Sequence, residues 1–155
     1  MKLSTLCYVK KDGRTLMLHR VKKKDDIHEG KWNGLGGKLE AGESPEECVI
    51  REIKEESGLR ISKPRLHGVL MFPEFGEKGS GEDWYVFVYT AEKFSGKLAD
   101  SREGVLSWID DRDIMKLNLW EGDKALSKWI GQNRFFSGKL VYKDGRFAGY
   151  SVEFY

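Results

Sequence analysis

Residues 37–59 read GKLEAGESPEECVIREIKEESGL, a glycine-containing segment that runs into an acidic stretch. Ser44 is a good N-cap, Pro45 suits the first helical position, and Glu47 completes a Ser-x-x-Glu capping box. Gly58 suits the left-handed position that follows the last turn of a helix. We therefore predict a helix that begins at Pro45 and ends just before Gly58.

The rest of the chain alternates short apolar runs with turn signals, and Asp12-Gly13 and Asp144-Gly145 are typical of hairpins. We predict strands at residues 5–10, 15–19, 69–72, 84–90, 105–109, 139–143 and 146–155, a second helix at 121–132, and irregular segments at 21–29, 34–42 and 74–83. Strands interspersed with few helices indicate an α/β (α+β mixed) fold, a mixed β-sheet packed between helices. Because no repeat or linker divides the chain, residues 1–155 are expected to form a single domain.

Composition narrows the possible partners. The formal net charge of +2 is too small to indicate binding to duplex nucleic acid or to an anionic membrane. No apolar run is long enough to span a bilayer or to act as a signal peptide. The two cysteines, Cys7 and Cys48, are too few for a disulfide framework. A cytoplasmic location is therefore expected.

The predicted helix carries Glu52, Glu55 and Glu56 on one face, because spacings of three and four residues bring side chains together. Three carboxylates this close repel one another, by roughly 3 kcal/mol for each pair at an effective dielectric near 20. Arg51 can pair with Glu55 along the helix. Neither Arg51 nor Lys54 is expected to point into the sector between Glu52 and Glu56.

A solvated acidic helix face is one interpretation of these glutamates, and a divalent metal site is the other. The acidic face borders the apolar stripe of the helix, so Glu56 should be partly buried. The preceding loop adds Glu43 and can supply backbone carbonyl groups. Magnesium prefers such oxygen ligands when it is shared with substrate phosphates, and this combination favours the metal site.

The segment from Gly37 to Leu59 resembles the Nudix box, G-x5-E-x7-R-E-U-x-E-E-x-G-U with U apolar, and every fixed position matches. This resemblance implies a loop-helix-loop that holds Mg²⁺, with Mn²⁺ as a substitute, on the diphosphate of a nucleotide. The implied ligands are Glu52 and Glu56, assisted by Glu55 and by the carbonyl group of Gly36 or Gly37. Arg51 would orient a glutamate through a salt bridge, and Glu43 would be structural or outer-sphere.

Members of the family often add one acid from a loop upstream of a strand tryptophan. Trp108 marks that strand here, and Glu103 is the first candidate for the extra metal ligand, with Asp100 second. An ordinary loop charge is the alternative interpretation of both residues.

Beyond the box, Trp32-Asn33-Gly34, Gly36-Gly37-Lys38, Trp120 followed by acids, and the closing hairpin resemble MutT-type oxidised-purine nucleoside triphosphate diphosphatases. This resemblance implies a substrate site formed by the residues Asn33, Gly36, Gly37, Lys38, Trp120 and Asp123. Asn33 and Asp123 would contact the base edge and Trp120 would stack on the base. The relatives have Trp-Pro-Asp-Asp where this chain has Trp120-Glu121-Gly122-Asp123, so one base-reading acid is missing unless Glu121 replaces it. A core position for Trp120 and a turn position for Asn33 are the alternatives.

The expected activity is metal-dependent hydrolysis of a nucleoside triphosphate to monophosphate and pyrophosphate, sanitising oxidised purines such as 8-oxo-dGTP. The alternatives are another Nudix substrate, such as a pterin triphosphate, a dinucleotide or an RNA 5′ end, or a catalytically silent nucleotide-binding module. The chain is expected to act as a monomer or homodimer. His19, His28 and His67 lack metal-binding spacing, so none is assigned to the metal.

Overall fold

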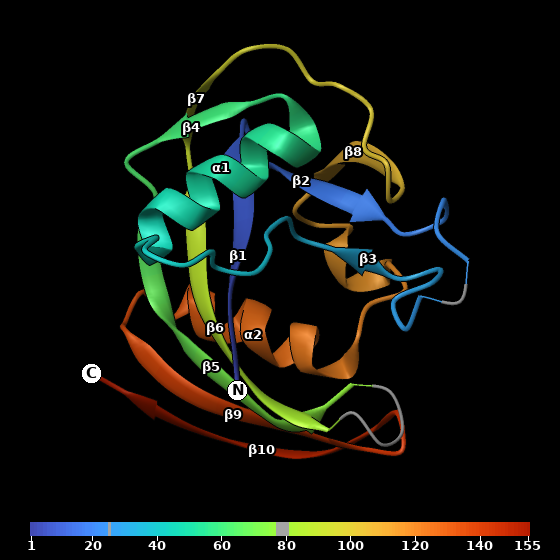
Figure 1. Cartoon of the computed structure of the whole chain (residues 1–155), viewed down its shortest axis with the longest axis vertical. Helices are drawn as coiled ribbons and strands as arrows, with labels where there is room; N and C mark the ends of the chain where they lie inside the picture. Colours follow the sequence, from blue (N-terminus) through green and yellow to red (C-terminus); the bar gives the residue numbers. More distant parts are fainter. Residues whose placement is uncertain (25, 77–80) are drawn as a thin grey trace.

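The computed structural model describes residues 1–24, 26–76 and 81–155 (Figure 1). Two of the predicted irregular segments, 21–29 and 74–83, therefore lie partly outside the described residues. The elements are β1 (Lys2–Lys11), β2 (Arg14–His19), β3 (Trp32–Asn33), α1 (Pro45–Ser57), β4 (Arg60–Ser62), β5 (Arg65–Phe75), β6 (Glu82–Ala91), β7 (Lys93–Ser95), β8 (Val105–Asp110), the 3₁₀ turn η1 (Ile114–Lys116), α2 (Glu121–Gly131), β9 (Phe136–Lys143) and β10 (Arg146–Phe154).

The main sheet runs β10-β9-β5-β6-β1-β2-β3, with β8 paired to β2, and a small separate sheet joins β4 to β7. It is mixed, because β1 pairs parallel with β6 and β5 with β9, while the other pairs are antiparallel. The glycine loop that precedes α1 lies along β1. Cys7 and Leu35 exchange two backbone hydrogen bonds, and Thr5 donates its N–H to the Gly37 carbonyl group. This pairing fixes the loop against the sheet.

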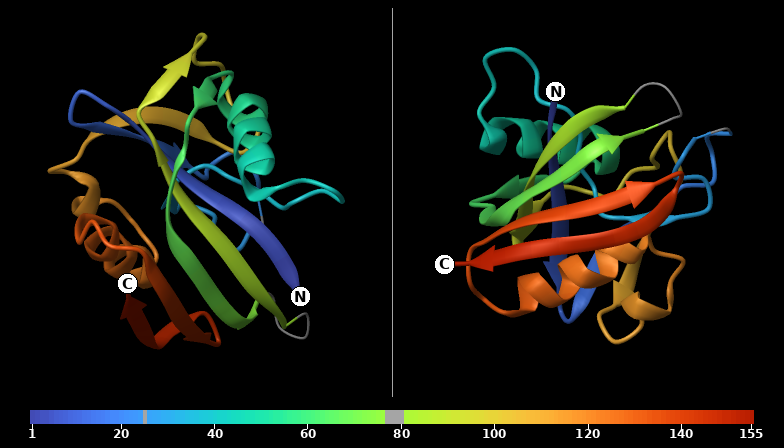
Figure 2. Two further views of the ribbon diagram at one scale, coloured as in Figure 1. Left: turned by 90° about the vertical axis from the view of Figure 1, so that its left-hand side faces the viewer. Right: turned by 90° about the horizontal axis from the view of Figure 1, so that it is seen from below.

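Two hydrophobic clusters form the core, one on each face of the sheet. On the α1 face, Val49 and Ile53 pack with residues such as Cys7. On the α2 face, Leu126 and Trp129 pack with residues of β5, β6 and β9. Figure 2 shows the two helices on opposite sides of the strands. The predicted mixed sheet between helices is confirmed.

Helix α1 begins and ends as predicted. Ser44 Oγ accepts the N–H of Glu47 at 3.1 Å, and Glu47 Oε2 accepts the N–H of Ser44 at 3.1 Å, which completes the capping box. Gly58 adopts the left-handed conformation with φ of 80° and donates its N–H to the Lys54 carbonyl group. Both hairpin turns also lie where the sequence predicts them.

The structure differs from the prediction mainly at short strands and at strand ends. The strands β3, β4 and β7 were not predicted, and they contain only two or three residues each. The predicted loop 74–83 is wrong at both ends, because β5 continues to Phe75 and β6 starts at Glu82; residues 77–80 lie outside the described chain. Cys7 and Cys48 are free and buried. None of the helices in the described residues is long and apolar enough to cross a membrane.

Candidate active site

The glycine loop meets α1 at the carboxylates of Glu52 and Glu56. A side chain at Gly37 would overlap the carboxyl group of Glu52, and one at Gly36 would overlap the backbone carbonyl of Thr5. Gly36 donates its N–H to Glu56 Oε2 at 3.4 Å. Glycines at these positions therefore let backbone and carboxylates approach closely.

Arg51 links the glutamates of this region. Its Nε and Nη2 donate to the two oxygens of Glu43 at 2.5 and 2.9 Å. Its Nη1 donates to Glu52 Oε1 at 2.7 Å and to Glu55 Oε2 at 3.2 Å. The predicted pairing of Arg51 with Glu55 is present, and the long guanidinium fork reaches Glu52 and Glu43 as well. These bonds lower the pKa of Glu43 to about 2.

Glu56 is half-buried, as predicted, and Glu55 is exposed. Burial, together with the negative charges of Glu103 and then Glu52, raises the pKa of Glu56 to about 8. Glu103 therefore lies near the helix carboxylates, and Arg20 Nη1 pairs with its Oε2 at 3.0 Å. Asp100 is exposed and is not among the charges that act on Glu56.

The donor chemistry of this cluster fits a hard divalent cation. The negative charges of Glu52 and Glu103 act on the half-buried carboxyl group of Glu56, and a cation would offset that repulsion. In the part of the chain that the structure describes, no three His, Cys, Asp or Glu side chains are already grouped around one point. A cation would therefore have to draw the glutamates together. The Gly37 carbonyl accepts the N–H of Thr5 at 2.9 Å, and because a carbonyl oxygen has two lone pairs, the carbonyl groups of Gly36 and Gly37 both stay candidates for the ligand.

A cavity of about 460 Å³ borders this cluster through Gly36 and Gly37. It brings together all six residues that the sequence assigns to the substrate, namely Asn33, Gly36, Gly37, Lys38, Trp120 and Asp123. They come from β3, from the glycine loop and from the start of α2. A cavity of this size accommodates a small organic ligand.

Asn33 and Asp123 contribute polar side chains to the wall of the cavity. No hydrogen bond among the described residues involves the side-chain amide of Asn33 or the carboxyl group of Asp123. Burial raises the pKa of Asp123 to about 7, and the positive charge of Lys31 opposes this rise.

Asn33 lies in β3, so its interpretation as a turn residue is wrong. Trp120 is half-buried on the cavity wall. Glu121 is exposed, pairs with Lys124 at 2.9 Å and does not line the cavity, so it does not replace the missing acid.

The family model described as NUDIX domain matches residues 2–130 of the sequence. The protein belongs to the Nudix family. The "Uncharacterized Nudix hydrolase YvcI" of Bacillus subtilis is 35% identical over 120 residues, which are 77% of this chain and 72% of the relative. The "Oxidized purine nucleoside triphosphate hydrolase" of Danio rerio is 33% identical over 142 residues, which are 92% of this chain and 87% of the relative.

Solved structures agree with this assignment. The crystal structure of a MutT protein from Bacillus halodurans superposes on this chain with a TM-score of 0.86 and is 29% identical in sequence. The match covers 99% of this chain and 98% of the Bacillus halodurans chain. The chain is therefore a MutT-type Nudix hydrolase with the fold of MutT structures.

Sequence reasoning missed the aromatic wall of the Nudix cavity, which consists of the side chains of Tyr8, His28, Phe72, Phe75, Trp84 and Tyr142. These residues come from a loop and four strands, and only the tertiary structure brings them together. The alternating pattern of β9 could have indicated Tyr142, because Leu140 and Tyr142 lie on the same strand face. No local signal distinguishes His28 from a loop histidine.

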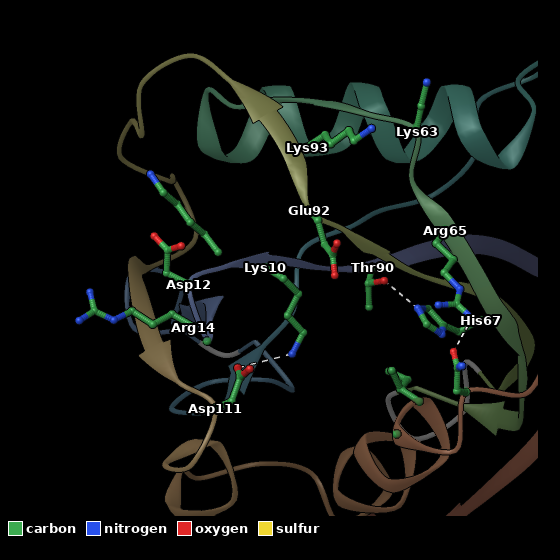
Figure 3. A pocket seen from close by; sticks show the side chains of 15 residues that line it. Lys10, Asp12, Arg14, Lys63, Arg65, His67, Thr90, Glu92, Lys93 and Asp111 are labelled. Atoms are coloured by element: carbon green, nitrogen blue, oxygen red, sulfur yellow. Dashed lines mark hydrogen bonds and ion pairs between the residues drawn. The ribbon is translucent and has the colours of Figure 1, made fainter.

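A second cavity, of about 800 Å³, lies at the other end of β1 and contains none of the predicted site residues (Figure 3). Many of its polar groups already contact one another. Lys10 pairs with Asp111 at 3.5 Å, and His67 Nε2 lies 2.7 Å from Thr90 Oγ1. The nucleotide-binding assignment therefore concerns the first cavity alone.

Proposed function

We propose that this Nudix hydrolase cleaves oxidised purine nucleoside triphosphates, such as 8-oxo-dGTP, to the monophosphate and pyrophosphate in the presence of Mg²⁺, with Mn²⁺ as a substitute. Residues 1–155 would act as one domain. One observation carries the proposal. A single cavity is lined by Gly36 and Gly37, which adjoin the carboxylates of Glu56 and Glu52, and by Trp120, Asn33 and Asp123.

The base end of the cavity can recognise a purine edge. The Asn33 amide both donates and accepts hydrogen bonds. Because the pKa of Asp123 is about 7, this carboxyl group occurs in both protonation states near neutral pH and can donate or accept. Trp120 offers an aromatic face to any base. Unpaired groups in a desolvated site discriminate strongly, because a ligand that fails to pair with them leaves them unsatisfied.

The phosphate end contains groups suited to a metal-bound diphosphate. Nudix hydrolases generally use divalent metal ions. Such an ion neutralises charge on the phosphates and lowers the pKa of an attacking water. Glu52, Glu56 and Glu103 would hold it, with Glu55 and the carbonyl group of Gly36 or Gly37 assisting. Arg51 keeps Glu52 oriented through the contact of 2.7 Å. Lys38 lies exposed on the rim and can attract the triphosphate.

The names of the relatives support the choice of substrate. Proteins of Danio rerio and Mus musculus named oxidized purine nucleoside triphosphate hydrolases match 92% of this chain. This chain differs from the MutT-type pattern in its single acid, Asp123, at the base end. Discrimination between oxidised and ordinary purines therefore depends on Asn33 and Asp123 together.

A substrate panel tests the proposal. Purified protein is incubated with Mg²⁺ and 8-oxo-dGTP, dGTP, dCTP, ADP-ribose, a dinucleotide, a pterin triphosphate or a 5′-triphosphorylated RNA, and the products are separated. We expect the highest kcat/KM on 8-oxo-dGTP, pyrophosphate as the product, and no turnover with EDTA. Faster hydrolysis of any other member would replace the proposed substrate, and no turnover of any member would indicate a silent binding module.

A further inference from the structure

The indole of Trp120 is held at its edge by a histidine. Trp120 Nε1 donates a hydrogen bond to His28 Nδ1 at 2.8 Å, across 92 positions of the sequence. The rings of His28, Phe75 and Tyr142 surround the indole at interplanar angles of 84°, 73° and 83°. Among the described residues, no ring therefore stacks flat on Trp120. The ammonium group of Lys31 lies over the indole at 5.1 Å from the ring centroid, so a ligand would stack on the opposite face.

The chemistry of this hydrogen bond determines the state of His28. An indole N–H can only donate, so Nδ1 of His28 must be the acceptor and carries no proton. Burial and the charge of Arg20, against the opposing charge of Asp26, lower the pKa of His28 to about 4. The imidazole is therefore neutral near pH 7, with its proton on Nε2.

Asp26 and Arg20 hold the backbone of His28 in place. Asp26 Oδ1 accepts the N–H of His28 at 3.2 Å, and Asp26 Oδ2 accepts Arg20 Nε and Nη2 at 3.0 and 2.6 Å. The side chains of Arg20 and Asp26 are only 16% and 9% exposed. Arg20 Nη1 also pairs with Glu103 at 3.0 Å. One arginine thus connects the loop of His28 to the carboxylate cluster.

We propose that His28 is a positioning residue of the base site, which accepts the indole N–H of Trp120 and so holds the indole ring in the orientation that stacks on the base. The inference rests on the proposed function, because it assigns the stacking surface to a purine. His28 acts through Trp120 and need not touch the substrate. The anchor formed by Asp26 and Arg20 keeps the acceptor atom at its place.

Loss of the acceptor has a defined consequence. A half-buried indole N–H that has lost its acceptor is stabilised when the indole rotates and the N–H donates to water instead. This rotation turns the indole face away from the base. Base binding lies away from the reacting phosphorus, so KM should rise while kcat changes little. A hydrogen bond of ordinary strength corresponds to a change of about five- to tenfold.

Kinetics of paired variants test the inference. His28→Ala should raise KM for the best purine substrate about five- to tenfold. His28→Asn places the amide oxygen near the position of Nδ1 and should restore KM to near the wild-type value. His67→Ala is the matched control, since this histidine lies in the second cavity, and it should leave KM unchanged. In a Trp120→Phe background, which lacks the indole N–H, His28→Ala and His28→Asn should give equal KM values. A KM increase that His28→Asn does not restore, or that persists in the Trp120→Phe background, would overturn the inference.

The indole N–H signal tests the same contact without substrate or metal. Comparison of ¹⁵N-labelled wild type with Trp120→Phe identifies the Trp120 resonance among the five tryptophans. This signal should shift and exchange faster with water in His28→Ala and stay in place in His28→Asn. An unshifted signal in His28→Ala would overturn the inference even if nucleotides are hydrolysed. A wild-type protein that hydrolyses no nucleotide would instead overturn the proposed function, and the signal would still report the contact.

Discussion

At the residue scale, Glu56 combines burial with two carboxylate neighbours, Glu52 and Glu103, and this raises its pKa to about 8. Glu56→Gln removes the charge and keeps the shape of the side chain. We expect this variant to lose turnover, because a metal ligand is missing, and to be at least as stable as wild type without metal. Glu55→Gln is the matched control on the same helix, and its loss should be smaller because Glu55 is 57% exposed. Near-normal activity of Glu56→Gln at saturating Mg²⁺ would refute the metal-site assignment.

The same carboxyl group predicts how stability depends on pH. In the folded, metal-free protein Glu56 keeps its proton up to about pH 8, whereas in the unfolded chain it ionises near 4.5. Between pH 7 and 8 the folded state thus binds more protons, so its stability should fall as pH rises, by up to about 1.4 kcal/mol for each pH unit. Asp123, whose pKa is about 7, adds a smaller decline of the same sign at the lower end of this range.

Urea unfolding in EDTA at pH 7.0, 7.5 and 8.0 measures this dependence. Glu56→Gln should flatten the decline that wild type shows. The lowered pKa of His28 contributes a slope of opposite sign that is the same in both proteins, so it does not affect the comparison. An identical slope in wild type and Glu56→Gln would show that Glu56 is already ionised in the folded protein.

At the element scale, the capping box should stabilise α1 without touching the substrate. Ser44→Ala removes the hydroxyl that accepts the Glu47 N–H and should cost about 1 kcal/mol of unfolding free energy. Ser127→Ala, at an exposed position inside α2, is the matched control and should be neutral or slightly stabilising. Substrate preference should stay the same in both variants. A melting temperature of Ser44→Ala equal to that of wild type would contradict the cap.

The elements also show how far the sequence alone can predict this protein. Helix α1 was predictable at both ends, because Ser44 and Gly58 act through neighbouring backbone. The two-residue strand β3 was not, since it is defined by its pairing with β2 and carries no pattern of its own. The reach of Arg51 to Glu43 and Glu52 depends on side-chain conformation rather than on helical spacing.

The cavity was predictable only in part for a related reason. Asn33, Trp120 and Asp123 were assigned through resemblance to MutT-type relatives, and the structure places them around one cavity. His28 contacts Trp120 only because a loop near β2 folds over the start of α2. Such contacts between distant segments leave no periodic trace in the sequence.

At the scale of the whole molecule, the cavity joins two sets of groups with separate tasks. The carboxylates of α1 adjoin Gly36 and Gly37 in the cavity wall, and Asn33, Trp120 and Asp123 line the cavity with polar and aromatic groups. Changes among the carboxylates should therefore affect turnover, and changes at the base end should affect selectivity. Trp120→Ala should weaken all purine nucleotides alike, because stacking is largely indifferent to the base edge.

The ratio of kcat/KM for 8-oxo-dGTP to that for dGTP, measured in wild type, Asn33→Ala and Asp123→Ala, tests the oxidised-purine assignment most directly. We predict that each variant loses about 1–3 kcal/mol of transition-state binding to 8-oxo-dGTP, because its partner on the base is left unpaired. The ratio should therefore fall toward one, and kcat should fall less than kcat/KM. Equal losses on both nucleotides, with the ratio unchanged, would contradict the oxidised-purine assignment and leave a Nudix hydrolase of another substrate.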